Sequence, residues 1–427
     1  MNRKIYNEYV TILESELVPA LGCTEPIALA YAAAKAKEVL GKMPDHITMR
    51  CSGNIIKNVK GVKVPNSGGM KGVEAAAVLG ITGGDPSQAL EVLEHVTDRE
   101  IDEAEKLLKA GFCDCVLKDD VANLYIEAYA VCKKTEKSEA LVVIEDEHTN
   151  ITHIEKDGQV LFHKEKKADK SLLNLEDIIT FANEVQITDV EKVLGRQIKY
   201  NTRIAEEGLR NPWGAQVGRV VLEEFGEDVK WRAVAKASAG SDARMSGCAL
   251  PVIINSGSGN QGMTCSLPVI EFGKELKKSK EEIYRALCVS NLVALNQKKY
   301  IGSLSAYCGA VCAAAGAGAG ITYLCGGTLE QIENTVVNTI ADAGGIVCDG
   351  AKPSCAAKIS TALQAAILSH KMAMRGLTFA RGEGLVMDCP EDTIKAVGYV
   401  GRAGMKQTDV EILNLMIGKT KLEDIDK

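Results

Sequence analysis

The sequence of 427 residues has no excess of positive charge, no cluster of histidines and no apolar run among its first residues. Its net charge is -7 at pH 7, and no run of lysine and arginine is interleaved with aromatic residues, so we expect no nucleic-acid partner. Its 6 histidines are scattered, which leaves a histidine-led metal site or catalytic triad without support. The first residues, MNRKIYNEYV, carry charges where a signal peptide needs an apolar segment, so we predict a cytoplasmic location.

Membrane and common cofactor signatures are missing as well. Residues 300–329 contain no charged side chain, but they consist largely of alanine, glycine, serine and cysteine. This composition predicts a buried helix that neighbouring helices approach closely, and no membrane partner. No lysine is paired with a phosphate-binding loop, so pyridoxal phosphate is not expected.

The composition that remains is typical of a globular protein, with 46% hydrophobic and 25% charged residues. The length suits two or three domains, and the charged run HKEKKADK at 163–170 is typical of a linker. We therefore predict an α+β fold. Its N-terminal α+β domain, residues 1–165, contains a mainly antiparallel sheet, and residues 171–427 form a mainly α-helical domain.

The spacing of apolar residues predicts the elements of both domains. Two helices are expected within residues 4–41, broken at Pro19, Gly22 and Pro26. Alternating or β-rich patterns predict strands at 46–52, 113–118, 123–131, 140–147 and 150–158, with helices at 69–80, 86–94 and 98–111. Helical spacing follows at 175–186, 203–226, 279–296, 303–322, 328–343, 355–375 and 404–417.

The stretch GGIVCDGAKPSC, residues 344–355, places Cys348 and Cys355 on either side of a glycine- and proline-containing turn. Such a turn lets the backbone fold back, so both sulfurs could face one point. A third thiol is available from Cys308 or Cys312, four residues apart on one helix face. The chain has no CxxC spacing, and three thiols suit an iron–sulfur cluster with one open iron. The alternative for each cysteine is a small buried apolar side chain.

The motif GCTEP places Cys23 at the start of a helix, with Pro26 in the first turn. The positive end of the helix dipole favours the thiolate form of such a cysteine, which could then accept a proton. The alternative is a cysteine that only packs at the helix end.

Three further stretches contain candidate substrate-binding residues. The loops predicted at 236–248 and 254–265 have successive small residues suited to anion binding. Arg244 in the first could clamp a carboxylate or cap a helix. The third stretch, 53–72, contains Lys57 as a possible base, for which an exposed lysine is the alternative. The polar and glycine residues expected to hold an amino acid are Asn58, Ser67, Gly68, Gly69, Asn255, Ser256, Asn260 and Gln261.

Together, GCTEP, the KN of IIKNVKG, SAGSDARMSG, NSGSGNQG, AYCGAVCAAAGAGAG and IVCDGAKPSC resemble the L-cysteine desulfidase family. That family is related to the iron–sulfur L-serine dehydratases, and the likeness covers nearly the whole chain. The resemblance implies a four-iron four-sulfur cluster, no pyridoxal phosphate, and conversion of L-cysteine and water to pyruvate, ammonia and sulfide. On the matching positions it implies Cys308, Cys348 and Cys355 as cluster ligands, with Cys312 less favoured, and Cys23 as the thiol near the substrate.

Three other functions stay open from the sequence. L-serine dehydration would use the same site, a non-catalytic amino-acid or redox sensor would use the same pocket, and a structural zinc site would close the thiols around one ion. For the lyase, Cys23 is the preferred base for the α-proton and Lys57 the reserve. We also expect the protein to form a homo-oligomer. Its expected ligand is a small amino-acid substrate.

Overall fold

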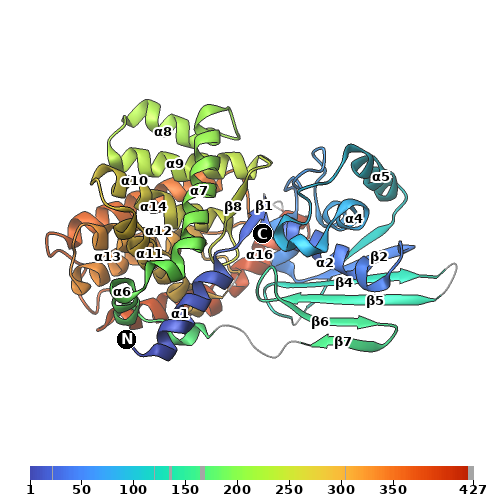
Figure 1. Cartoon of the computed structure of the whole chain (residues 1–427), viewed down its shortest axis with the longest axis horizontal. Coiled ribbons are helices and arrows are strands. Elements are labelled where there is room, and N and C mark those ends of the chain that lie inside the picture. The colour runs from blue at the N-terminus through green and yellow to red at the C-terminus, as the bar shows by residue number, and fades with distance from the viewer. Residues whose placement is uncertain (22, 120, 134–136, 164–168, 303, 422–427) are drawn as a thin grey trace.

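The computed structural model describes residues 1–427 except 22, 120, 134–136, 164–168, 303 and 422–427. Figure 1 shows a mainly helical part beside a part built on a sheet. The predicted linker at 163–170 falls mostly outside the described residues, and the domain boundary there stays a prediction. None of the helices that the structure describes is both long and apolar enough to cross a bilayer.

The sheet has six strands in the order β3-β2-β4-β5-β6-β7. Only β2 and β3 are parallel, so the predicted α+β class with a mainly antiparallel sheet is confirmed. Helices α2, α4 and α5 lie along one side of the sheet in Figure 1, and α2 contacts β4 and β5. The strands are β2 (His46–Cys51), β3 (Cys113–Leu117), β4 (Tyr125–Cys132), β5 (Ser138–Glu145), β6 (Ile151–Lys156) and β7 (Gln159–His163). The helices are α2 (Thr24–Leu40), α3 (Gly53–Val59), α4 (Val73–Gly83), η1 (Pro86–Glu91) and α5 (Asp98–Lys109).

The second part is helical, as predicted, and is built around the charge-free helix α12. Helix α12 packs against α10, α11, α13 and α14 because its glycines allow backbones to touch. A Cβ on Gly316 would lie 2.4 Å from the carbonyl oxygen of Ser290, so the approach requires glycine. The helices are η2 (Lys170–Leu172), α6 (Leu175–Glu184), α7 (Ile187–Arg210), α8 (Val217–Phe225), α9 (Val229–Met245), α10 (Gly259–Glu275), α11 (Lys280–Ile301), α12 (Gly309–Leu324), α13 (Leu329–Ala343), α14 (Cys355–Ala373), α15 (Pro390–Tyr399), η3 (Val400–Gly404) and α16 (Lys406–Ile417).

Several element predictions were wrong in detail. The stretch 236–248, predicted as a loop, belongs mostly to α9, because its small residues pack helix against helix rather than forming a turn. The single helix predicted at 203–226 is two helices separated at 211–216, where Gly214 has φ +56°. Strand β7, the short helix α3 and helix α15 were not predicted, and 86–94 forms a 3-10 helix rather than an α-helix.

Several contacts join the parts around the site. Strand β1 (Pro19–Leu21) pairs antiparallel with β8 (Pro251–Ile253), which brings the start of α2 close to the loop before α10. At the other end of the chain, α16 packs against α3. Helix α1 (Arg3–Glu16), although N-terminal, contacts α7 and α11 of the helical part. Segments distant in the sequence therefore meet where the two parts touch.

Candidate active site around three cysteines

Cys308, Cys348 and Cys355 all line one cavity between the two parts of the chain. Cys308 is the N-cap of α12, and Cys355 begins α14. The amide of Cys348 donates to the carbonyl of Ala306 at 2.7 Å, and the amide of Cys308 donates to Ile346 at 3.1 Å. These two hydrogen bonds bring the segment before α12 alongside the Cys348 turn, so the thiols of Cys308 and Cys348 lie side by side.

The three thiols differ in how easily they ionise. A hydrogen bond from Cys308 lowers the pKa of Cys348 against the effect of burial, and the positive charges of Lys57 and Lys358 lower it further. The same hydrogen bond and burial raise the pKa of Cys308. Burial also raises the pKa of Cys355, although the amide of Lys352 donates to its sulfur at 3.4 Å. Cys348 is therefore the first of the three to become a thiolate.

Cys312, the alternative third thiol, lies one turn further into α12 and is fully buried. It is not among the residues that line the cavity. The backbone carbonyl of Cys312 accepts a hydrogen bond from Gln297 at 3.2 Å, so this turn packs against α11. The geometry favours Cys308 over Cys312 as the thiol facing the cavity. All fourteen cysteines are free thiols.

Two glycines beside the cysteines make room for polar side chains. A Cβ on Gly309 would lie 2.6 Å from the amide group of Gln261. Gly350 has φ +96°, a backbone conformation that favours glycine, and a Cβ there would lie 3.0 Å from Oδ1 of Asn58. Both amide side chains can therefore reach the cavity beside the thiols.

The first turn of α10 supplies the polar wall. Asn260 and Gln261 line the cavity, and their buried side-chain oxygens have no hydrogen-bond partner among the residues described. Ser256, at φ +49°, also lines it. Asn255 does not: it is fully buried, and its amide nitrogen donates to Oδ1 of Asn291 at 3.0 Å. Of this predicted loop, 254–258 is irregular and the rest is helix.

Lys57 and Asn58 enter the cavity from α3. Lys57 is buried rather than exposed, because its ammonium group donates to Oδ1 of Asp409 in α16 at 2.5 Å. The other oxygen of Asp409 accepts the amide of Ala306 at 2.9 Å. Asn58 donates from Nδ2 to Oε1 of Glu25 at 3.0 Å. The α3 side chains are thus tied both to α16 and to the start of α2.

Cys23 is the N-cap of α2, as predicted, but the predicted preference for thiolate was wrong. Its side chain is 2% exposed and packs with Val62 and Met245. Burial raises the pKa of the Cys23 thiol well above its ordinary value, and the carboxylate of Glu25 raises it further. The thiol donates to Oε2 of Glu25 at 3.2 Å. Desolvation and a neighbouring negative charge outweigh the helix dipole here.

The remaining candidates lie away from the cysteines. Ser67 donates to the carbonyl of Val64 at 2.7 Å in a separate turn, and neither Ser67 nor the adjacent Gly68 and Gly69 line the cavity. Arg244 is buried in α9, where Gly259 allows its guanidinium to approach: a Cβ on Gly259 would lie 2.5 Å from Nε. The substrate-binding roles of Ser67, Gly68 and Gly69 stay predictions.

Sequence reasoning missed several residues of the site, among them Glu25 and His148; Lys298, Lys358 and Asp409 were not singled out either. Glu25 is buried and accepts hydrogen bonds from Cys23, Thr24 and Asn58. Burial acts to raise the pKa of Glu25, but His148 and Arg244 outweigh it and lower the pKa, so Glu25 is ionised. Glu25 belongs to the quoted GCTEP motif and could have been singled out. His148, in the turn between β5 and β6, had no sequence signal because the histidines are scattered.

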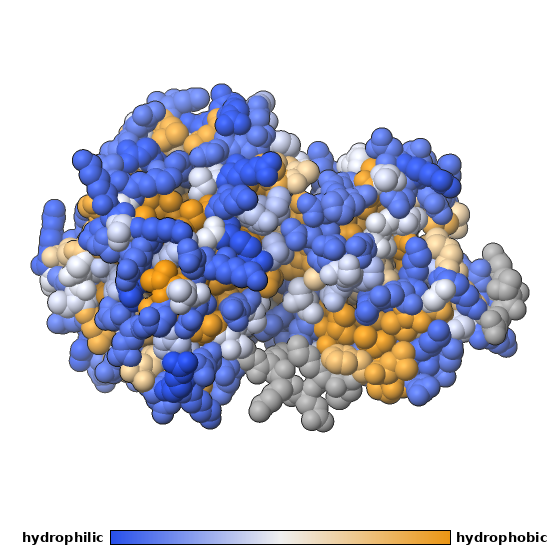
Figure 2. All heavy atoms as spheres, in the orientation of Figure 1, coloured by the Kyte–Doolittle hydropathy of each residue, from blue (hydrophilic) through white to orange (hydrophobic). Residues whose placement is uncertain are grey.

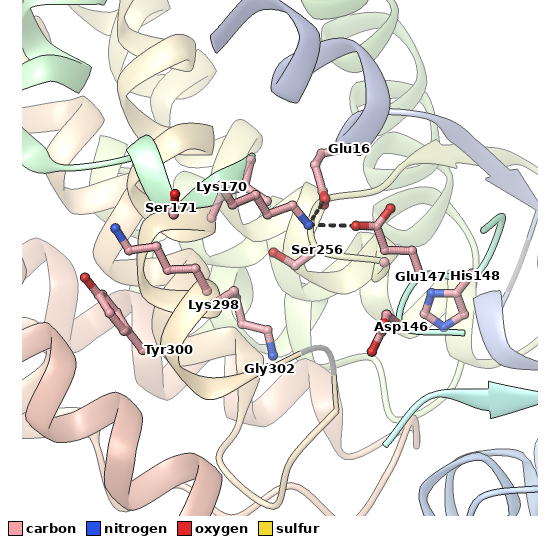
Figure 3. A pocket seen from close by; sticks show the side chains of 13 residues that line it. Glu16, Asp146, Glu147, His148, Lys170, Ser171, Ser256, Lys298, Tyr300 and Gly302 are labelled. Carbon is pink, nitrogen blue, oxygen red and sulfur yellow. Dashed lines mark hydrogen bonds and ion pairs between the residues drawn. The ribbon is translucent and has the colours of Figure 1, made fainter. Parts of the chain in front are cut away.

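A larger cavity of about 510 Å³ adjoins this site (Figure 3). The two cavities share four lining residues, namely His148, Ser256, Gly257 and Lys298. In the larger cavity, the ammonium of Lys170 pairs with Glu16 and, at 3.0 Å, with Glu147. Within the part of the chain that the structure describes, no three His, Cys, Asp or Glu side chains, the three cavity cysteines included, are arranged to hold a single metal ion.

Comparison with known proteins supplies the family. The family model described as serine dehydratase alpha chain matches residues 87–414. The chain belongs to the serine dehydratase alpha chain family. The predicted relation to serine dehydratases is thereby confirmed. The match includes all three cavity cysteines and the α10 amides of this family member, whereas Cys23 and α3 precede it.

Relatives of this serine dehydratase alpha chain family member match it over nearly its whole length. A UPF0597 protein of Lachnoclostridium phytofermentans is 53% identical over 419 residues, which cover 97% of this chain and 100% of the relative. UPF0597 proteins of Desulfitobacterium hafniense and Finegoldia magna are 49% and 47% identical, covering 97% and 96% of this chain and 98% and 99% of the relatives. These names state no substrate.

Proposed function

We propose that the chain is an iron–sulfur-dependent lyase that converts L-cysteine and water to pyruvate, ammonia and hydrogen sulfide by α,β-elimination. The observation that carries the proposal is the convergence of Cys308, Cys348 and Cys355 on one cavity that also presents unpartnered amide groups. The resemblance to the L-cysteine desulfidase family and the match to the serine dehydratase alpha chain family both support a lyase.

The residues at this cavity fit a cluster. Thiolates are the protein ligands of iron–sulfur clusters, and Cys348 has a lowered pKa beside the positive charges of Lys57 and Lys358. No fourth cysteine lines the cavity among the residues described, so three ligands would leave one iron open. Cys308, Cys348 and Cys355 would hold the cluster, which when bound supplies a Lewis acid for the leaving group on the β-carbon.

The chain's own polar groups would bind the amino acid. Side-chain oxygens of Asn58, Asn260 and Gln261 are buried without a partner among the described residues, and all three residues line the cavity. Oδ1 of Asn54 is a fourth such oxygen at this cavity, so the amides offer enough acceptors for the three N–H donors of an α-ammonium group. Fixing this group orients the α-hydrogen toward a base. Cys23 and Lys57 are the bases that the sequence predicts.

L-serine is the second candidate substrate, favoured by the serine dehydratase family match. The two reactions differ only in the leaving group, a thiol or a hydroxyl. Soft thiolate groups suit iron that is held by other thiolates, which supports L-cysteine. Pyruvate release from L-cysteine and L-serine, measured side by side at equal concentration, decides between them.

The experiment that tests the proposal begins with reconstitution of the protein without oxygen. We expect bound iron and acid-labile sulfide, and equal amounts of pyruvate and sulfide released from L-cysteine. Cys348→Ala should lose both the iron and the activity. Cys312→Ala, in the same helix but facing away from the cavity, should keep both. Pyruvate release by iron-free Cys348→Ala would contradict the proposal, and binding of an amino acid by loaded protein without any product would favour the sensor alternative.

We also propose a homo-oligomer. Figure 2 shows apolar side chains gathered over the region of β6 and β7, and Val160, Leu161 and Phe162 of the edge strand β7 are exposed. An exposed apolar patch on an edge strand supports association with another chain. The mass in solution from light scattering tests this proposal, and a monomer at micromolar concentration would contradict it.

A further inference from the structure

The wall between the two cavities contains a histidine whose ring nitrogens have no hydrogen-bond partner in the described part of the chain. His148 lines both the cysteine-lined cavity and the larger one, and Figure 3 shows its imidazole at the edge of the larger cavity. The side chain is 4% exposed. Both ring nitrogens are buried and have no partner among the residues described. Because a buried imidazole normally makes at least one hydrogen bond, these nitrogens indicate a missing ligand.

The adjacent loop is shaped around this ring. Gly257 has φ +75°, and a Cβ at this position would lie 2.5 Å from Nδ1 of His148. Ser256, with φ +49°, precedes it in the same turn. Only glycine tolerates both this backbone and this contact. The turn therefore packs against the imidazole without forming a hydrogen bond to either ring nitrogen.

The charged groups around His148 favour a neutral ring that can still accept a proton. Burial lowers the pKa of His148, and it outweighs the nearby carboxylate of Glu25, which raises it. The ring is therefore neutral at pH 7. Once protonated, it would be stabilised by ionised Glu25. The charged groups that act on its pKa are Glu25 from α2, Arg244 from α9 and Glu147 from its own turn. The other charged side chains that line the two cavities with it are Lys57, Lys298 and Lys358 at the cysteine-lined cavity and Glu16, Asp146, Lys170, Lys298 and Lys299 at the larger one.

Neither base predicted from the sequence is suited to accept the α-proton. The Cys23 thiol is protonated and donates to Glu25. The ammonium group of Lys57 is paired with Asp409. His148 is the buried group at this cavity with unused ring nitrogens beside a carboxylate.

We propose that His148 is the catalytic base that removes the α-proton of the amino-acid substrate. This inference rests on the proposed function and names a residue that neither the sequence motifs nor the family match singles out. The C–H bond at Cα breaks, its proton passes to an imidazole nitrogen, and its electron pair forms the Cα=Cβ bond. The Cβ–S bond breaks and its electron pair leaves with sulfur as hydrosulfide. The aminoacrylate product tautomerises and is hydrolysed by water to pyruvate and ammonia, with no net oxidation.

The first experiment compares wild type with His148→Ala and His148→Gln after anaerobic reconstitution. We expect unchanged iron and sulfide content in both variants and a loss of kcat of about a hundred- to ten-thousand-fold, the range for removal of a general base. Free imidazole should restore part of the activity of His148→Ala but not of His148→Gln, whose side chain still fills the site. Unchanged turnover of His148→Ala would overturn the proposal.

The pH profile adds a signature that a structural role would not produce. Since the base acts in its neutral form and its pKa is lowered, wild-type kcat/KM should fall only as pH drops below about 6.5. The residual activity of His148→Gln should lack this limb. An identical acid limb in wild type and variant would overturn the assignment.

Gly257→Ala tests positioning with a matched control. The added methyl would collide with the imidazole, so we expect kcat to fall with cluster content unchanged. Gly326 has a similar φ of +78° but nothing within 4 Å, so Gly326→Ala introduces comparable backbone strain without touching His148. Equal kcat for the two variants would contradict the role of the Gly257 contact.

A separate measurement distinguishes failure of this inference from failure of the proposed function. In protein labelled with ¹⁵N-histidine, the His148 signal is the one absent from His148→Gln. We expect saturable movement of that signal on addition of L-alanine, which has the α-ammonium, carboxylate and α-hydrogen but no leaving group. If wild type releases no pyruvate yet the signal moves, the lyase proposal fails while His148 keeps its contact with an amino acid. If the signal does not move, the His148 inference is refuted.

Discussion

Replacing Asp409 by asparagine removes the negative charge that holds Lys57 at the cavity. The two groups lie 2.5 Å apart, with side chains that are 2% and 13% exposed for Lys57 and Asp409. Asparagine can still accept the amide of Ala306 through its side-chain oxygen, so the hydrogen bond next to the cysteine segment is retained. The substitution therefore isolates the charge pair between α3 and α16.

The expected loss is large because Lys57 would be left buried without its counter-charge. Removing one partner of a buried ion pair costs about 3–5 kcal/mol, and the partial exposure of Asp409 favours the lower end. This is a substantial part of a total folding free energy of about 5–15 kcal/mol. An exposed pair provides the control. Lys280 and Glu191 are 2.9 Å apart but 68% and 51% exposed, so Glu191→Gln should cost no more than about 1 kcal/mol.

The assay is urea denaturation of the cluster-free protein, completed as a double-mutant cycle with Lys57→Met. Methionine fills a similar volume without charge, so the double variant should lose about 1–3 kcal/mol less than the sum of the single losses. The reasoning would be refuted if Asp409→Asn cost no more than Glu191→Gln, or if the two single losses were additive.

The remaining predictions concern the Cys348 turn and pH. Gly350→Ala should destabilise the protein more than Gly302→Ala. Both glycines have φ +96°, so each substitution costs about 1–2 kcal/mol of backbone strain, but a Cβ on Gly350 would also contact Asn58, whereas Gly302 has nothing within 4 Å. Equal losses of unfolding free energy in urea denaturation would contradict a role for the Asn58 contact. Burial lowers the pKa of His370 to about 4, with Lys371 contributing, so the fold favours the neutral ring. The associated stability, about 3 kcal/mol, is present above pH 6.5 and is lost as pH falls toward 4. His370→Asn should lose this part of the pH dependence, and an unchanged difference between pH 7 and pH 4 would refute it.

Much of the fold could be predicted because local patterns report burial directly. The alternating HITMRC became β2, with buried and half-buried residues in turn. The charge-free segment became a core helix because its small residues allow close packing. The errors arose where small residues have two uses: in 236–248 they suit a turn as well as a helix packed against other helices, and only the neighbouring helices select between them.

The candidate site was predictable in part for a similar reason. Cys348 and Cys355 are separated by a short turn, so their closeness follows from local geometry. Cys308 could not be separated from Cys312 by spacing, and only the folded chain places Cys308 among the residues that line the cavity and leaves Cys312 out. The isolated His148 gave no pattern at all.

The sequence by itself determined which residue types are available: three thiols in two segments, amides at the start of a helix, and a cysteine at a helix N-terminus. Tertiary structure alone decided their chemistry. Burial and Glu25 keep Cys23 protonated, Asp409 holds Lys57, and the Gly257 turn brings His148 between two cavities. Protonation depends on desolvation and on charges within a few ångströms, and those neighbours come from segments that only the folded chain brings together.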